Sequence, residues 1–143
     1  MTLVKKITTM EELELVYPVM SELRANLSLD SFITQFGRQQ EQGYQIVALI
    51  NFGDVMSLAG FRVCENFAMG KFLYIDDLVT AARFRSQGCG QFLLSWLKQF
   101  AINEGCGQLH LDSHVTRHGA HRFYLQQRLD ISAYHFYVGL DGN

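Results

Sequence analysis

Six consecutive residues, Arg85-Ser86-Gln87-Gly88-Cys89-Gly90, have a composition suited to binding an anion. The glycines allow the backbone to approach a phosphate group closely, because no Cβ stands in the way. An apolar helical pattern begins directly after them, so consecutive N–H groups and the positive end of a helix dipole would point at the same anion. Arg85 adds a positive charge suited to phosphate. This stretch is therefore predicted to bind a phosphate-containing ligand.

Two common nucleotide motifs fit the stretch less well. A P-loop requires GxxxxGK[ST], which the sequence lacks. A dinucleotide fingerprint requires GxGxxG directly after its strand, but Leu93 occupies the place of the third glycine and the preceding strand pattern ends near Thr80. Asp112 does lie near the distance expected of a ribose-binding acid, so dinucleotide binding stays open as an alternative.

A third interpretation combines this stretch with two others. Asp76-Asp77-Leu78-Val79-Thr80, followed by Arg85 to Gly90, resembles the central signature of the GNAT superfamily of acyl-CoA-dependent N-acyltransferases, a bulged strand followed by R/Q-x-x-G-x-G/A. Ala120-His121-Arg122-Phe123-Tyr124 resembles the A-x-x-F-Y segment of the same family. One departure is Arg128-Leu129, where the family often has Gly-Phe. The resemblance covers essentially the whole chain and implies an N-acetyltransferase that uses acetyl-CoA.

The resemblance implies a direct attack of an amine on the thioester within a ternary complex. Loss of the ammonium proton costs about 4 kcal/mol at pH 7, and a carboxylate near the nitrogen eases that step. Asp76 is implied as this base, with Asp77 in reserve. Adjacent strand residues point to opposite faces unless a bulge intervenes, so we expect only one of the two to face the acceptor. The alternative is that either acid is solvated or paired with an arginine.

The resemblance also implies which residues contact the acyl donor. Tyr124 would donate a proton to the departing thiolate and lie beside the CoA sulfur, although a buried structural tyrosine is an alternative. The pantetheine arm would contact the backbone of Leu78, Val79 and Thr80, and also Ser113. The pyrophosphate would bind to Arg85, Ser86, Gln87, Gly88, Cys89 and Gly90.

Metal binding and thiol chemistry are weaker interpretations. Four histidines, at positions 110, 114, 118 and 121, are close in sequence. His110 falls in a predicted strand and His114 in a loop, and no HExxH occurs, so no metal site is expected. Cys89 lies near a predicted helix N-terminus, where thiolates are favoured, but packing is the preferred interpretation.

Composition limits the class of protein. The 143 residues are 48% hydrophobic and only 18% charged, which excludes intrinsic disorder and is consistent with one domain over 1–143. A net charge of −2 lacks the excess of positive charge that is typical of nucleic-acid-binding proteins, so no nucleic-acid partner is expected. No apolar run is long enough to span a membrane, and no secretory signal follows Met1. Three cysteines without CxxC spacing favour free thiols, so we expect a cytoplasmic location.

The hydrophobic patterns predict the elements that must position these residues. Capping-box spacing from Thr9 to Glu12 opens a helix that Pro18 should kink or split, and a second helix should run from Ser28 or Ser31 to Gly43. Gly88 to Glu104 is the clearest helix and Arg117 to Leu129 is another. Strands are predicted at 3–7, 44–51, 54–62, 71–80, 108–112 and 131–140. The expected fold class is α/β (α+β), GNAT-like, with a mixed, mainly antiparallel sheet flanked by about four helices.

Three functions remain at this point. The first is an N-acetyltransferase that acts on a primary amine, either a small cationic amine, as the Asp76–Asp77 pair suggests, or a peptide or protein amine. The second is a non-catalytic acyl-CoA sensor of the same fold, and the third a dinucleotide-binding protein. The resemblance also implies a homodimer, for which the aromatic residues Tyr134, Phe136 and Tyr137 are candidates, although these could equally be buried within a monomer.

Overall fold

Residues 2–142 are described in a computed structural model, in which the chain forms two compact units that divide between Leu111 and Asp112. The described residues contain five strands, four α-helices and one short 3-10 helix. Within this part of the chain, no helix is long and apolar enough to cross a membrane. The mixed, mainly antiparallel sheet and the helix count confirm the predicted fold class.

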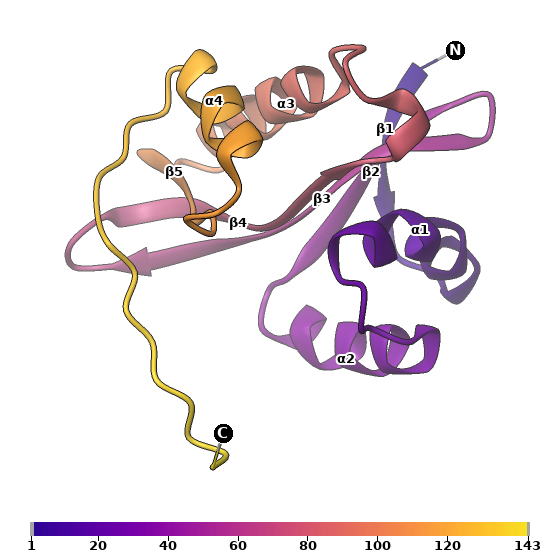
Figure 1. The fold of residues 1–143 in the computed structure, drawn as a ribbon, viewed down its shortest axis with the longest axis horizontal. Helices are drawn as coiled ribbons and strands as arrows, with labels where there is room; N and C mark the ends of the chain where they lie inside the picture. The colour runs from indigo at the N-terminus through magenta and orange to yellow at the C-terminus, as the bar shows by residue number, and fades with distance from the viewer. Residues whose placement is uncertain (1, 143) are drawn as a thin grey trace. The chain divides into compact units, whose positions relative to one another are not determined.

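The first unit is built on a five-stranded sheet in the order β1-β2-β3-β4-β5. Strands β1 (Thr2–Ile7), β2 (Gln45–Asn51), β3 (Asp54–Asn66) and β4 (Gly70–Thr80) are antiparallel to their neighbours, and β5 (Gln108–Leu111) is parallel to β4. Figure 1 shows the long β3–β4 pair through the middle of the sheet. The predicted strands at 3–7, 44–51, 71–80 and 108–112 are confirmed with small shifts, and β3 extends beyond its predicted end to Asn66.

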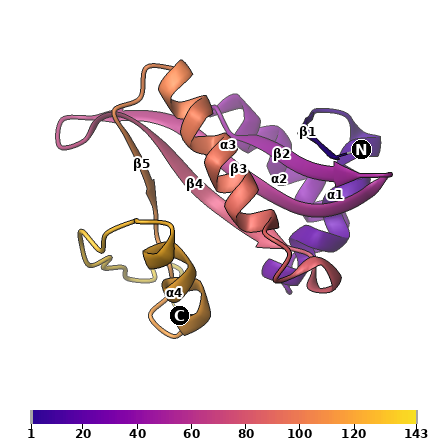
Figure 2. The same ribbon diagram turned by 90° about the horizontal axis from the view of Figure 1, so that it is seen from above.

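Three helices cover the two faces of this sheet. Helices α1 (Met10–Leu23) and α2 (Leu29–Glu41) lie on one face, and α3 (Cys89–Asn103) lies on the other, as Figures 1 and 2 show. A sheet covered on both faces requires strands that are apolar on both sides. The run Ile46–Leu49 of β2 is accordingly buried at every position. The rigid sheet then fixes the end of β4 and the start of α3, where the candidate residues lie.

Helix α1 begins as predicted but is not split. The Thr9 side chain accepts from the Glu12 N–H at 3.1 Å, and the Glu12 carboxylate accepts from the Thr9 N–H at 3.0 Å. Thr8 and Thr9 donate backbone N–H groups to Glu12 and lower the pKa of its carboxyl to about 2. Pro18 removes one helical hydrogen bond, but the helix continues through it because Val16, on its inner face, is fully buried beside Val19 and Met20. The predicted split was wrong.

The second unit contains α4 (His118–Gln126), which is shorter than the predicted helix 117–129. The Arg128 backbone at φ 69 ends this helix region, and Leu129 N–H bonds to Tyr124 O at 3.0 Å. The strand predicted for 131–140 is absent, because these residues have no regular secondary structure in the described chain. A strand requires a hydrogen-bonded neighbour, and apolar alternation alone does not supply one. Ile131, Tyr134, Phe136, Tyr137, Val138 and Leu140 are all exposed.

Candidate active site

A β-bulge in β4 determines how the two adjacent acids are presented. Gly60 of β3 pairs with Asp77 whereas Phe61 pairs with Ile75, so Asp76 is the extra residue. Simple strand alternation would send the two side chains to opposite faces. With the bulge, Asp76 and Asp77 both line the same pocket. The bulge is the exception that sequence analysis allowed for, and which of the two acids faces the acceptor stays a prediction.

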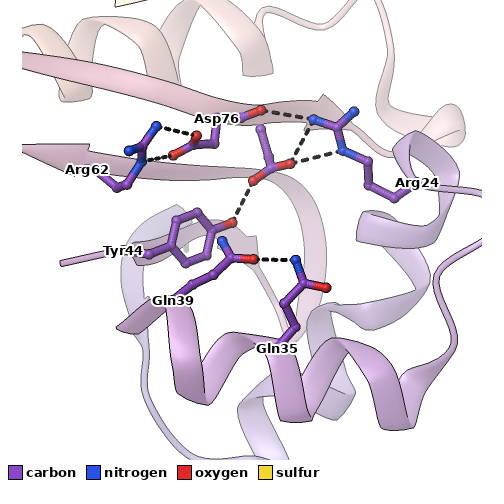
Figure 3. Close-up of polar contacts among 7 residues, drawn as sticks. Arg24, Gln35, Gln39, Tyr44, Arg62 and Asp76 are labelled. Atoms are coloured by element: carbon purple, nitrogen blue, oxygen red, sulfur yellow. Dashed lines mark hydrogen bonds and ion pairs between the residues drawn. The ribbon is translucent and has the colours of Figure 1, made fainter. Parts of the chain in front are cut away.

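Each acid has its own arginine (Figure 3). Arg62 of β3 donates to both oxygens of Asp76, at 2.8 Å each, and the pKa of Arg62 is raised by these hydrogen bonds. Arg24, the residue that caps the C-terminus of α1, donates from Nε to Asp77 Oδ1 at 3.0 Å and from Nη2 to the Asp76 carbonyl at 2.9 Å. The alternative that sequence analysis left open, acids paired with arginines, is thus what the structure shows.

Tyr44 is the third partner of Asp77. Its hydroxyl donates to Asp77 Oδ2 at 2.6 Å, and its side chain is only 4% exposed. Burial raises the pKa of Tyr44 well above its usual value, and the neighbouring negative charge of Asp77 raises it further. Tyr44 therefore remains a neutral hydrogen-bond donor throughout the physiological pH range. Both Asp77 oxygens are held, one by a phenol and one by a guanidinium.

Gly60 makes the Tyr44–Asp77 contact sterically possible. A Cβ at Gly60 would lie 2.7 Å from Asp77 Oδ2 and closer still to the Tyr44 hydroxyl. Real Cβ atoms essentially never approach another atom so closely. Because Gly60 has no side chain, the Tyr44 phenol and the Asp77 carboxylate can pack directly over its backbone and hydrogen-bond to each other.

These residues form one wall of a pocket of about 330 Å³. Helix α2 contributes Gln35 and Gln39, whose side-chain amides are hydrogen-bonded to each other at 2.7 Å (Figure 3). The remainder of the lining is largely apolar, and the full set is Met20, Arg24, Leu27, Phe32, Gln35, Phe36, Gln39, Tyr44, Asp76 and Asp77. The pocket lies wholly within the first unit and has the size of a small-molecule site.

Beyond the acids, β4 has an open edge. Strand β5 pairs with Phe72–Ile75 only, so residues 76–80 have no strand partner on that side within the described chain. The Val79 carbonyl accepts from Ser57 of β3 at 2.9 Å, whereas the Thr80 carbonyl accepts from Arg85. Because strand residues alternate, the polar backbone groups of Leu78 and Thr80 face the open edge and those of Val79 face β3. Val79 is otherwise a core side chain, 9% exposed.

The predicted anion-binding stretch leads from β4 into α3. Gly88 is the N-cap of α3 with φ 82, a left-handed conformation that favours glycine. No side chain caps this helix and no acid lies in its first turn, so its leading N–H groups are available to an external acceptor. Arg85 is exposed and lies 3.6 Å from Glu22. Cys89 is buried, which raises the pKa of its thiol and supports packing rather than nucleophilic chemistry.

Two predicted site residues, Ser113 and Tyr124, belong to the second unit. The Ser113 hydroxyl is buried and has no hydrogen-bond partner among residues 2–142. Tyr124 lies in α4, and burial raises the pKa of its phenol, so it stays protonated at neutral pH. His121 Nε2 contacts the His114 carbonyl at 2.8 Å. In the described residues, no group of three or more metal-ligating side chains is arranged to hold a metal.

Comparison with known proteins identifies this arrangement. The model of the acetyltransferase (GNAT) family matches residues 7–129, which span both units. The chain belongs to this family. Its members are acyl-CoA-dependent N-acyltransferases, and this chain is such an enzyme. The resemblance inferred from the β4–α3 motif and the Tyr124 segment is therefore confirmed, and the dinucleotide alternative is set aside.

Individual relatives agree with the family assignment. The GNAT chain is 36% identical over 121 residues to the uncharacterized N-acetyltransferase YhdJ of Bacillus subtilis, covering 84% of this chain and 85% of that protein. It is 27% identical over 132 residues to an aminoalkylphosphonate N-acetyltransferase of Salmonella typhimurium, covering 90% and 85%. The fold is similar to that of the aminoglycoside N-acetyltransferase AAC(6')-Iy in complex with CoA, with a TM-score of 0.84 at 11% identity, covering 99% and 95%.

Sequence analysis of this GNAT chain missed four residues around the acids. Arg24, Tyr44, Gly60 and Arg62 lie far from Asp76 and Asp77 along the chain, and Arg24 is 53 positions from its partner Asp77. Only Gly60 gave a local signal, since an isolated glycine in a strand pattern indicates a bulge or a close backbone approach.

Proposed function

We propose that this GNAT enzyme transfers an acetyl group from acetyl-CoA to the primary amine of a small molecule. The observation that carries the proposal is the continuous path along β4 and into α3. It begins at the acids Asp76 and Asp77, follows the open backbone edge at Leu78 and Thr80, and ends at the uncapped helix start at Gly88. An amine site, an extended-chain site and an anion site follow one another in the order that an acyl-CoA and an acceptor amine require.

The residues present fit the donor. The first-turn N–H groups of α3, with Arg85 beside them, would hold the pyrophosphate through Ser86, Gln87, Gly88, Cys89 and Gly90. The open edge at Leu78 and Thr80 offers backbone partners for the amides of the pantetheine arm. Ser113 stays a candidate for that arm on the family resemblance. The Val79 backbone faces β3, so we assign the strand contacts to its two neighbours.

The donor supplies an activated thioester, so that a C–N bond to the acceptor forms while the C–S bond breaks. The ammonium proton of the acceptor must leave first, and a carboxylate of the acid pair accepts it, directly or through a water. Both acids have both oxygens hydrogen-bonded, Asp76 to Arg62 alone and Asp77 to Arg24 and Tyr44. We assign the proton to Asp77 rather than to Asp76, which the resemblance implied, because Asp77 Oδ2 accepts only from the neutral Tyr44 hydroxyl, whereas each Asp76 oxygen is paired with the cationic Arg62, which disfavours protonation. A backbone N–H at the open edge polarises the carbonyl, and the Tyr124 hydroxyl donates the proton that the thiolate takes up.

The size of the pocket supports a small acceptor rather than a protein side chain. A volume of about 330 Å³ is at the lower end of the range of ligand sites. The printed name of the Salmonella relative, an aminoalkylphosphonate N-acetyltransferase, also describes a small amine acceptor.

The test is thiol release from acetyl-CoA by the purified full chain with a panel of primary amines. The panel contains n-propylamine, putrescine, beta-alanine, beta-alaninamide, aminoethylphosphonate and a lysine-containing peptide. Calorimetric titration with acetyl-CoA, and with NAD as the control ligand, is run on the same preparation. Saturable acetyl-CoA binding and amine-dependent thiol release support the proposal. Binding without thiol release for every amine would instead favour the acyl-CoA sensor of the same fold.

We further propose that both units act as one acetyltransferase domain and that the enzyme is a homodimer. The family model spans both units, and α4 has no buried residue of its own. Six large apolar side chains in 131–140 are exposed, including Phe136 and Tyr137 at 90% each. A second copy would cover such a segment. Light scattering should give twice the monomer mass for the native chain and the monomer mass for Phe136→Asp; a monomeric native chain would contradict the dimer.

A further inference from the structure

The charges of the acceptor pocket cancel. Three charged residues line it, Arg24, Asp76 and Asp77, and Asp76 is already neutralised by Arg62. What remains on the pocket wall is one ion pair, Arg24 with Asp77, at 2.9 Å. Its two members differ in access, because the Arg24 side chain is 49% exposed and the Asp77 side chain only 12%. The pocket therefore offers a ligand one accessible cation and one acid rather than a surplus of negative charge.

Hydrogen-bonding capacity is left over on both members of this pair. A guanidinium has five N–H donors, and the contacts of Arg24 use Nε and Nη2. Nη1 of Arg24 has no partner among residues 2–142 and carries two further donors. Asp77 Oδ1 faces both Nε and Nη2 of Arg24, whereas Oδ2 accepts only from Tyr44 and, as a carboxylate oxygen, has a second acceptor site. A ligand can thus reach both charges without dismantling the network.

Charge compensation then discriminates between acceptors. A simple ammonium that binds Asp77 shares the charge of that acid with Arg24 and leaves the guanidinium less compensated. A simple anion on Arg24 has the reverse effect on Asp77. A dication adds charge that nothing in the pocket neutralises. Only a zwitterion, with its ammonium at Asp77 and its acidic group at Arg24 Nη1, supplies a partner to each half of the ion pair.

We propose that the preferred acceptor is a small zwitterion, a primary amine that carries a carboxylate or phosphonate at the other end of a short chain. This inference rests on the proposed function and narrows its acceptor. Arg24 is the specificity-determining residue, because its Nη1 presents two N–H donors and a positive charge to an acidic group. Asp77, held in place by Tyr44 over Gly60, receives the ammonium.

The test compares acceptors that differ in one group. Beta-alanine and beta-alaninamide have the same carbon chain and the same primary amine, but only the first has an acidic group. With the native enzyme, we expect kcat/KM to be at least about tenfold higher for beta-alanine, which corresponds to about 1.4 kcal/mol. Aminoethylphosphonate should behave like beta-alanine, whereas n-propylamine and putrescine should behave like the amide.

Two variants test whether Arg24 is the residue that causes the preference for beta-alanine over beta-alaninamide. Arg24→Gln should reduce the beta-alanine to beta-alaninamide ratio to about one, because the anion partner is gone. Arg38→Gln removes an exposed arginine of α2 that does not line the pocket, and it should retain a ratio near that of the native enzyme. Circular dichroism establishes that each variant is folded, and the native enzyme alone suffices if Arg24→Gln does not fold.

The outcomes separate this inference from the proposed function. Thiol release with a ratio near one, or a preference for putrescine or the lysine peptide, would overturn the zwitterion acceptor and leave the acetyltransferase function intact. A preference that survives Arg24→Gln would overturn the role of Arg24. If acetyl-CoA binds but none of the amines gives thiol release, the proposed function itself would be overturned, and this inference with it.

Discussion

Replacing Gly60 by alanine should damage the acceptor pocket without touching the donor site. The added Cβ would lie 2.7 Å from Asp77 Oδ2 and would collide with the Tyr44 hydroxyl, so the phenol and the carboxylate must separate. The lost hydrogen bond to a charged group is worth about 1.5–3 kcal/mol. Forcing a buried ring aside in a packed core costs about 1–3 kcal/mol more.

We therefore expect Gly60→Ala to lower the free energy of unfolding by about 2.5–6 kcal/mol, the combined size of these two effects. Urea unfolding of the purified variant measures this change. Because Asp77 is displaced from the acceptor, the acceptor KM should rise by about tenfold or more, while the acetyl-CoA dissociation constant stays within about twofold of the native value. Steady-state kinetics and calorimetric titration measure the two separately.

The chain supplies a matched control in Gly37→Ala. Gly37 lies in α2, where a Cβ would meet nothing within 4 Å, and its substitution should stabilise the helix by about 0.5–1 kcal/mol. If Gly60→Ala unfolded at the native urea concentration and kept the native acceptor KM, the close meeting of Tyr44 and Asp77 over Gly60 would be refuted. A change in acetyl-CoA affinity equal to the change in acceptor KM would refute the separation of the two sites.

Four further predictions follow from individual contacts. Gly88→Val should abolish acetyl-CoA binding in calorimetry, because a β-branched residue does not adopt φ 82; retained affinity would remove the pyrophosphate from this helix start. Tyr124→Phe should lower kcat by at least about tenfold with little change in acetyl-CoA affinity, and an unchanged kcat would exclude Tyr124 as the proton donor. Arg128→Gly should raise stability in urea unfolding by about 1 kcal/mol, since glycine adopts φ 69 without strain, and no gain would mean that the arginine makes a compensating contact. The pKa of Glu12 falls from 4.5 to about 2 on folding, so its contribution is complete above pH 4.5 and is lost as pH falls toward 2; Glu12→Gln should flatten that part of the stability curve, and an unchanged curve would exclude the capping box as its cause.

The local structure of the proposed donor side was predictable from sequence because its signals are local. The backbone conformation at Gly88, the uncapped start of α3 and the end of β4 are all encoded within residues 76–90. Glycine at a helix start permits a positive φ, and an apolar stripe after it indicates a helix that packs against the core. The helix predicted from Gly88 to Glu104 was accordingly found at Cys89–Asn103, with Gly88 as its N-cap.

The proposed acceptor side was not predictable in the same way, because the residues that contact its acids come from distant elements. Arg24 ends α1, Tyr44 precedes β2 and Arg62 lies in β3, and only the sheet brings them to β4. No periodicity or motif specifies such contacts. Residues 131–140 show that a local pattern can also mislead. Their alternating apolar residues predict a strand, but among the described residues no neighbouring strand pairs with them.

The acid pair shows how a partner can reverse the meaning of a motif. Two adjacent aspartates in sequence indicate a site for a cation, because the charges add. Arg62 and Arg24 cancel those charges one by one, and they do so with unequal access, so that one arginine belongs to the wall of the sheet and the other to the acceptor pocket. The acid that we propose for the amine, Asp77, is then inseparable from the arginine beside it. An enzyme with this pocket should therefore discriminate among amines by the charge at the far end of the molecule, a property that neither aspartate could confer alone.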